Sequence, residues 1–192
     1  MPGVRVALLA DTHGFLDPRV AECVGNSDYA VHAGDIGGAD VLLALQPREE
    51  LVAIRGNNDS ERTWGDGERH FLETLPRQAT LDLPGGQLVV IHGDDSGSLE
   101  QRHRRYRRQY SDAGAVVYGH SHRLLVDTDT RPWLLNPGAA GRTRTNGGPS
   151  CLVLICEQAR WQLEHYRFER RRYPAVRHQT RDDSDSVTPD ED

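Results

Sequence analysis

Several short apolar segments of this chain run directly into aspartate, asparagine or histidine, and this pattern restricts the fold more than any other feature. The segments have the length and composition of buried strands. The polar motifs that follow them are Asp11-Thr12-His13, Gly34-Asp35, Gly56-Asn57, His92-Gly93 and Gly119-His120-Ser121-His122. Open α/β sheets place their chemistry at the carboxyl ends of the strands. The pattern therefore predicts one polar site assembled from distant parts of the chain.

The order of the expected elements predicts the fold class. We expect strands at residues 4–10, 29–33, 51–54, 79–83, 87–91, 115–118, 124–128, 132–135, 151–156 and 162–168. Helices are expected at 18–24, with Asp17 as its N-cap, at 98–110, and from a cap at Asp40 to Leu45. Strands and helices alternate first, and strands dominate later. This order predicts an α/β layered sandwich of two mixed β-sheets flanked by helices.

Composition limits the class of protein further. We expect one domain at residues 1–173 and an acidic, disordered tail at 174–192, where apolar residues are scarce. The formal net charge of -6 argues against a general nucleic-acid binder. Cys151 and Cys156 should face opposite sides of one strand, so a reduced, cytoplasmic protein is expected. Because no apolar run approaches the length of a membrane span, we expect no membrane partner.

The polar strand-end residues form a mixed oxygen and nitrogen donor set. In extended backbone, side chains two positions apart point the same way, so His120 and His122 should aim at one place. A His-x-His pair alone is more typical of core or solvated histidines than of a metal site, so the other donors are essential. Mixed donors suit Mn²⁺, Fe, Zn²⁺ or Ni²⁺ better than Ca²⁺. The candidate ligands are Asp11, His13, Asp35, Asn57, His92, His120 and His122.

Seven ligands exceed what one centre needs, so two metals bridged by Asp35 are the simpler interpretation. In this order, the motifs resemble the five blocks of the calcineurin-like metallophosphoesterase superfamily. Chain length and Asn136-Pro137-Gly138 resemble its small single-domain prokaryotic phosphodiesterase branch. The resemblance implies two divalent ions, first of all Mn²⁺, with Ni²⁺, Zn²⁺, Fe or Mg²⁺ also compatible. It places one ion on Asp11, His13, Asp35 and His122, and the other on Asp35, Asn57, His92 and His120.

This ligand set predicts phosphoester hydrolysis. Two ions can hold a bridging water, lower its pKa and present hydroxide in line with phosphorus. We therefore expect hydrolysis of a small phosphodiester substrate. The expected catalytic residues are Asp35, Asn57 and His92. The expected substrate-binding residues are Arg142 and Arg144, whose guanidinium groups can bind phosphate, and Asn58.

Two positions depart from the family pattern. Asn58 stands where many larger members have a histidine thought to protonate the leaving group, so no general acid, worth roughly 10² to 10⁴ in rate, is carried over. Asp94 follows His92-Gly93 where close relatives often have histidine. Its negative charge predicts a preference for diesters over monoesters. Asp59 either orients a ligand histidine or caps its loop.

Other functions are weighed against this one. A eukaryotic retromer subunit resembles the family but binds partners with a degraded metal set, so a protein-binding scaffold is the rival; here all seven ligand positions are filled. A nuclease would need a broad basic groove, and the basic run Arg102–Arg108 is more typical of a solvated helix face. A homodimer is allowed, although no segment indicates an interface. His32 is expected to be structural, and the expected surface histidines are His70, His103, His165 and His178.

Overall fold

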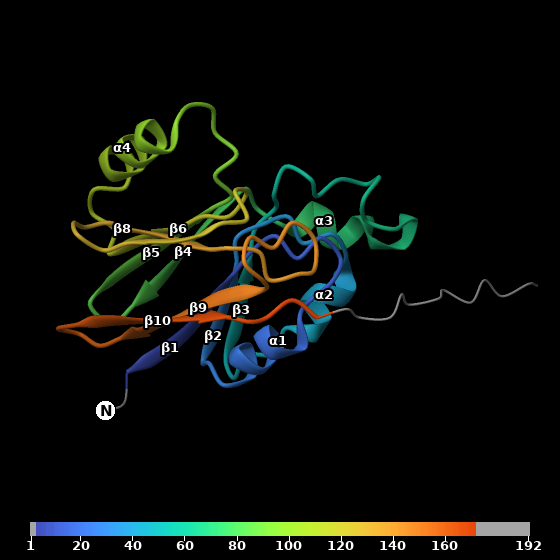
Figure 1. Ribbon diagram of the computed structural model, residues 1–192, viewed down its shortest axis with the longest axis horizontal. Coiled ribbons are helices and arrows are strands. Elements are labelled where there is room, and N and C mark those ends of the chain that lie inside the picture. Colours follow the sequence, from blue (N-terminus) through green and yellow to red (C-terminus); the bar gives the residue numbers. More distant parts are fainter. Residues whose placement is uncertain (1–2, 172–192) are drawn as a thin grey trace, which may run out of the picture.

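Two five-stranded sheets pack face to face in the computed structural model, which describes residues 3–171 (Figure 1). The strand order is β10-β9-β1-β2-β3 in one sheet and β4-β5-β6-β8-β7 in the other. Helices α1 and α2 lie outside the first sheet and α4 outside the second. The predicted α/β sandwich of two mixed sheets is confirmed. The predicted tail at 174–192 lies outside the described residues.

The first sheet aligns three parallel strand ends. Its strands are β1 (Val4–Leu9), β2 (Tyr29–His32), β3 (Glu50–Ala53), β9 (Ser150–Cys156) and β10 (Trp161–Arg167). Leu9 pairs with His32, and His32 pairs with Ala53, so β1, β2 and β3 finish at the same level. The polar residues after these strands therefore emerge at one edge. This register brings Asp11, Asp35 and Asn57 to the same part of the molecule.

The second sheet makes the same alignment from the other side. Its strands are β4 (Gln78–Leu83), β5 (Gly86–Ile91), β6 (Ala115–Val117), β7 (Leu124–Asp127) and β8 (Trp133–Pro137). Strands β5, β6 and β8 are parallel, and Val117 of β6 pairs with Val90 and Leu135. The segments that contain His92 and His120 consequently leave the sheet next to each other.

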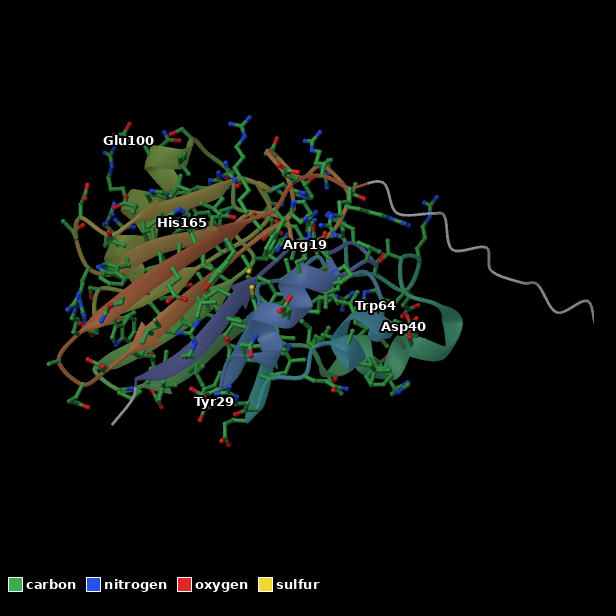
Figure 2. All side chains as sticks on the ribbon, turned by 60° about the horizontal axis from the view of Figure 1, so that its bottom comes forward. Arg19, Tyr29, Asp40, Trp64, Glu100 and His165 are labelled. Carbon is green, nitrogen blue, oxygen red and sulfur yellow. The ribbon has the colours of Figure 1, made fainter. Side chains whose placement is uncertain are left out.

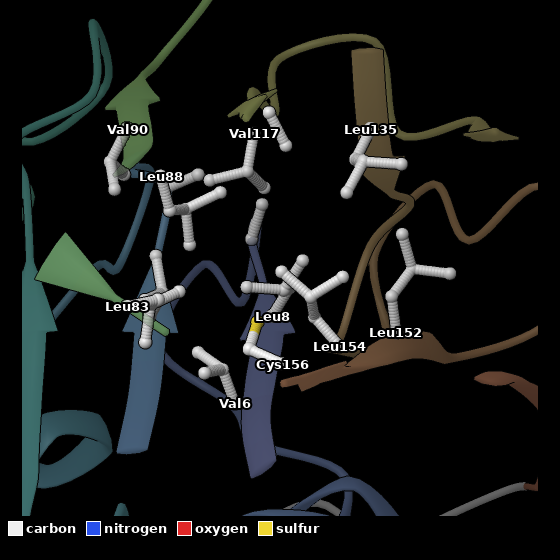
Figure 3. Packing of buried hydrophobic residues seen from close by; sticks show 14 of the residues in the cluster. Val6, Leu8, Leu83, Leu88, Val90, Val117, Leu135, Leu152, Leu154 and Cys156 are labelled. Atoms are coloured by element: carbon white, nitrogen blue, oxygen red, sulfur yellow. The ribbon is translucent and has the colours of Figure 1, made fainter. Parts of the chain in front are cut away.

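The main core lies between the two sheets. Val6 and Leu8 of β1 pack there with residues such as Leu88, Val117 and Leu135, all of them fully buried (Figure 3). Ala7 and Leu9, the alternate residues of β1, face α1 and α2 in a separate cluster. Burial on both faces explains why β1 is an uninterrupted apolar run. The packing of β1 on both faces also fixes where along the sheet Asp11 emerges.

The helices mostly follow the expected pattern. They are α1 (Pro18–Gly25), α2 (Ala39–Ala44), the 3₁₀ turn η1 (Asp66–Glu68), α3 (Arg69–Thr74) and α4 (Leu99–Gln109). Asp40 is not the cap of α2: Gly38 is, and Asp40 lies in the first turn. Helix α3 was not expected, because it is six residues long and has no side-chain cap. None of the helices in residues 3–171 has the length and apolarity of a membrane-spanning helix.

The N-cap of α1 gives a test of the fold. Buried Asp17 accepts a hydrogen bond of 3.0 Å from the backbone N–H of Arg19. Asp17→Ala should lower the free energy of unfolding by about 1–2 kcal/mol, because the helix loses its cap. Asp17→Asn keeps an acceptor oxygen and should lose less. Both variants also lose the ion pair of 2.8 Å between Asp17 and Arg19, so the difference between them in urea unfolding measures the cap, and equal losses would contradict the capping role.

Candidate metal centre

Hydrogen bonds between loops hold the strand ends together. The backbone N–H of Asp11 donates to Gly34 O at 3.0 Å, and that of Gly119 donates to His92 O at 3.0 Å. The backbone N–H of His120 donates to Asp11 Oδ1 at 3.1 Å and so joins the two sheets. The loops after β1, β2, β5 and β6 therefore form one continuous wall.

Six of the seven candidate ligands lie together in this wall, in two groups that share Asp35. In each group, one nitrogen or carboxylate oxygen per residue lies within 4.8 Å of the others. The first group is Asp11, His13, Asp35 and His122, and the second is Asp35, His92 and His120. Asn57 Oδ1 lies 2.9 Å from His92 Nε2 and 3.0 Å from His120 Nδ1, beside the second group. For the six grouped residues, this division is the same as in the ligand sets that the resemblance implies, and the binding of metal by them stays a prediction.

The local backbone differs from the sequence expectation. Strand β6 ends at Val117, and His120 and His122 have left-handed φ angles of 67° and 55°. The expectation that both histidines point to one place from extended backbone is therefore wrong. His122 Nε2 faces His13 Nε2 at 3.1 Å, whereas His120 faces Asn57 in the other group. The turn separates the two imidazoles between the two groups.

Left-handed backbone is shared by most of the donors. Five of the seven residues have φ between 47° and 67°: Asp11, His13, Asp35, His120 and His122. Each such residue costs about 1–2 kcal/mol relative to ordinary backbone. Strain of this kind is concentrated at functional sites, where the surrounding structure holds it. Here the holding contacts are the hydrogen bonds between the loops.

Asp35 is held as a charged group. Burial raises its pKa, but hydrogen bonds from His92 and Asn58 oppose this and keep the pKa well below its usual range. Asn58 donates from its backbone N–H at 2.9 Å and from its side-chain amide at 2.7 Å. Since the carbonyl of Ala33 can only accept, His92 donates to it from Nδ1 at 2.8 Å. The other ring nitrogen, Nε2, faces Asp35 Oδ1 at 3.3 Å.

Asp11 carries an unsatisfied oxygen into the interior. The residue is fully buried, and among the described residues its Oδ2 has no hydrogen-bond partner. Burial raises the pKa of Asp11 to about 7. An unpaired buried carboxylate is costly unless it binds a cation. The residues of the first group therefore fit a divalent ion.

The comparisons with known proteins agree with this geometry. The model of the calcineurin-like phosphoesterase superfamily domain matches residues 4–159, which contain both groups. The chain belongs to this superfamily. A probable metallophosphoesterase from Methanocaldococcus jannaschii is 27% identical over 70% of this chain and 67% of its own length. One from Methanothermobacter thermautotrophicus is 24% identical over 78% of this chain and 84% of its own.

Solved structures share the fold. A predicted phosphoesterase from Streptococcus pneumoniae has a TM-score of 0.62 and 19% identity, and covers 91% of this chain and 95% of its own. Zinc-complexed Vps29 from Entamoeba histolytica has a TM-score of 0.64 and 17% identity, and covers 85% of this chain and 99% of its own. As a calcineurin-like phosphoesterase, the chain belongs to a family of divalent-metal hydrolases.

The two predicted substrate arginines of this phosphoesterase differ in position. Arg144 Nη2 lies 3.4 Å from His13 Nε2, at the edge of the first group. Arg142 instead lies over the ring of Phe15, 5.0 Å from its centroid. Of the contacts that the structure shows for these two arginines, only that of Arg144 is to a candidate metal ligand. Asn58, the third predicted substrate residue, directs both donors to Asp35.

Asp59 organises the loops rather than a histidine. Its carboxylate accepts hydrogen bonds of 2.9 Å from the backbone N–H groups of Ile36, Gly37 and Gly56 and from the indole of Trp64. The loop-capping alternative is therefore the one that these contacts support. By holding the loop after β2 against the loop after β3, Asp59 positions Asp35 and Asn57 relative to each other.

Two histidines outside the groups have structural contacts. His32 is fully buried, and its Nε2 lies 2.9 Å from the hydroxyl of Thr12, as a structural residue would. Burial lowers the pKa of His32 to about 4. The prediction that His103 lies at the surface is wrong: it is buried, 2.7 Å from the Tyr118 hydroxyl. His103 and Tyr106 are three positions apart, so both face the sheet in the otherwise polar helix α4.

Two supporting residues were missed by the sequence analysis. The side-chain amide of Asn136 donates to Gly119 O at 2.8 Å and to Ser121 Oγ at 3.1 Å. The amide of Asn146 donates to His122 O at 3.0 Å. The Asn-Pro-Gly motif that starts at Asn136 signalled the first contact. Asn146 lies in a loop whose path nothing in the sequence indicates.

Neutralising Asp11 should separate stability from metal binding. In EDTA at pH 8, Asp11→Asn should raise the free energy of unfolding by roughly 1 kcal/mol, because the chain no longer buries an unpaired charge. The same variant should lose most of the increase in Tm that Mn²⁺ gives the unaltered chain. Thermal unfolding with and without Mn²⁺ measures both. Asp40→Asn, at an exposed position, is the control and should change neither; a full Mn²⁺ response in Asp11→Asn would contradict the assignment.

Proposed function

We propose that this chain is a binuclear metal-dependent phosphodiesterase that hydrolyses a small phosphodiester. The sharing of Asp35 by both donor groups is the observation that carries the proposal. One carboxylate with two oxygens, held by Asn58 and His92, is suited to bridge two cations. Curated relatives that include a phosphodiesterase from Methanocaldococcus jannaschii, 22% identical over 70% of this chain and 83% of its own length, support the reaction class.

The donor set also supports the choice of metal. Both groups contain only carboxylate, imidazole and amide donors, and no thiolate. Such donors are compatible with Mn²⁺, which we propose as the native ion. When bound, two such ions supply Lewis-acid activation of the attacking water and of the phosphoryl group. Asp35, Asn57 and His92 are the residues that we assign to catalysis, through that centre.

The surrounding residues orient these groups. Ala33 O fixes the ring of His92, and Asn58 fixes both oxygens of Asp35, so neither side chain has to reorganise when a substrate arrives. We propose that Asn58 affects the substrate through Asp35. Since an amide has no proton to give at neutral pH, residue 58 supplies no general acid. Good leaving groups should therefore react best.

Charge at the two ends of the site supports a preference for diesters. Arg144 lies next to His13, where it can bind a non-bridging phosphate oxygen. Asp94 is exposed, and its charge acts to raise the pKa of His120, against the larger opposing effect of burial. A phosphomonoester has one more negative charge than a diester and is repelled more strongly by Asp94. We therefore propose a small, singly charged phosphodiester as substrate and a cytoplasmic site of action.

The rival functions have less support. Vps29 from Entamoeba histolytica shares the fold at 17% identity, so a scaffold role is the first rival. The complete donor set of this chain favours metal binding instead. A nuclease would need free basic side chains, but three of the five arginines of α4 are already engaged. Arg104 pairs with Glu100 at 2.8 Å, Arg107 pairs with Asp127 at 2.7 Å, and Arg102 binds Gly93 O.

The proposed reaction is tested by turnover of bis(4-nitrophenyl) phosphate with added Mn²⁺. The unaltered chain should hydrolyse this diester with a higher kcat/KM than 4-nitrophenyl phosphate, and EDTA should stop the reaction. Asp35→Asn should lower kcat by at least about 10³, because the bridging charge is lost. Asp40→Asn should keep the activity. A folded, Mn²⁺-loaded chain without turnover would favour the scaffold.

The role of Arg144 can be separated from that of Arg142. Arg144→Ala should raise KM for the diester about tenfold, the effect of losing one charged hydrogen bond to phosphate, and change kcat less. Arg142→Ala is the matched control, since Arg142 is equally exposed in the same loop but lies over Phe15. Steady-state kinetics of both variants give the comparison. Equal changes in KM would contradict an assignment to Arg144 alone.

A further inference from the structure

Two cysteines far apart in the sequence meet between α1 and the first sheet. Cys23 lies on α1, between the buried residues Val20 and Val24 that face the sheet. Cys151 is fully buried in β9 and belongs to the same cluster, whereas Cys156 faces the core between the two sheets. Two sulfur atoms are visible next to each other beside α1, the helix that contains Arg19, in Figure 2.

The two thiols interact with each other. Cys23 packs against the cluster that contains Cys151, and the interaction of the two side chains lowers the pKa of Cys23 and raises that of Cys151. Of the two thiols, Cys23 is therefore the one that loses its proton more easily. Such a thiol is the one that reacts with oxidants, and its neighbour is placed to resolve the product.

The reactive member of the pair can be reached from outside. Cys23 is half-buried and lines a cleft of about 360 Å³. Arg5, Arg19, Tyr166 and Phe168 also line this cleft. Val153, two positions from Cys151 on the same face of β9, lies there too. A small oxidant can thus approach Cys23, while Cys151 stays behind it.

We propose that Cys23 and Cys151 form a reversible redox site, in which a hydroperoxide oxidises the pair to a disulfide between α1 and β9. This site is separate from the metal centre and goes beyond the proposed hydrolase function. The Cys23 thiolate attacks the hydroperoxide, an S–O bond forms, the O–O bond breaks, and the leaving alkoxide takes a proton to become an alcohol. The sulfur of Cys151 then attacks the sulfenic acid: the S–S bond forms, the S–O bond breaks, and hydroxide leaves with the Cys151 proton as water.

The disulfide would join two elements that are distant in the chain. Because it links residues 23 and 151, it closes a long loop of the unfolded chain, which stabilises the folded state. Both residues already belong to one packed cluster between α1 and β9. We expect the oxidised chain to have a Tm several degrees above that of the reduced chain, and dithiothreitol to reverse the change.

Thiol counting after peroxide treatment tests the proposal. The full chain is treated with hydrogen peroxide in EDTA, unfolded, and titrated for free thiols. The unaltered chain should fall from three thiols to one, and Cys156→Ala from two to none. Cys23→Ala should keep two. Mass spectrometry of the tryptic digest of Cys156→Ala should then show one cross-linked pair of peptides. The variant is needed because Cys151 and Cys156 lie in the same tryptic peptide of the unaltered chain, where a bond to either cysteine would look the same.

Other results would overturn the assignment. These are three thiols retained after treatment, irreversible oxidation of Cys23 with Cys151 unchanged, a bond to Cys156, or cross-linked dimers. Diesterase activity does not enter the measurement. The redox site and the proposed hydrolase function can consequently fail independently.

Discussion

The carboxylate of Asp35 is the group on which the rest of the site depends. It belongs to both donor groups, accepts two hydrogen bonds from Asn58 and lies 3.3 Å from His92. Its position requires a close approach of two loops: a Cβ atom on Gly56 would collide with the backbone nitrogen and side chain of Asp35. Glycine at position 56 therefore allows the loops after β2 and β3 to meet. Asp59 then ties them together through three backbone N–H groups.

Backbone strain and buried charge are concentrated at the site and are not required by the two sheets. Left-handed backbone at the donors and a buried Asp11 carboxylate whose Oδ2 has no hydrogen-bond partner among the described residues both oppose folding. The sandwich can tolerate them because its core between the sheets is continuous and fully buried. A rigid scaffold with costly loops is the usual arrangement in sites where geometry matters more than stability.

The sequence predicts the scaffold well and the loops less well. Apolar runs such as 4–10 identify the strands, and the polar residue after each run identifies the edge where the strands end, because both depend on local pattern. The conformation of His120 and His122 is not local: it follows from hydrogen bonds to Asp11 and from Asn136 and Asn146. Helix α3 was missed since its only buried residue is Leu72.

Burial inside α4 was misjudged for a related reason. The helix is rich in arginine, so its sequence pattern is polar and does not indicate that His103 and Tyr106 face the sheet. The positions of Arg142 and Arg144 depend on a loop without a repeating pattern, so the sequence could name both but could not rank them. The resemblance to the superfamily supplied the grouping of the ligands, which the spacing of the motifs alone does not contain.

The unpaired oxygen of Asp11 has a consequence for the chain inside a living cell. Under the proposed metal binding, newly made protein folds with Asp11 Oδ2 unpaired until it binds a cation. Quality-control proteases recognise chains that open often, so the steady-state abundance of this protein should follow the metal supply of its host. Under the proposed metal dependence, starvation for the ion would then lower the amount of the protein as well as its activity.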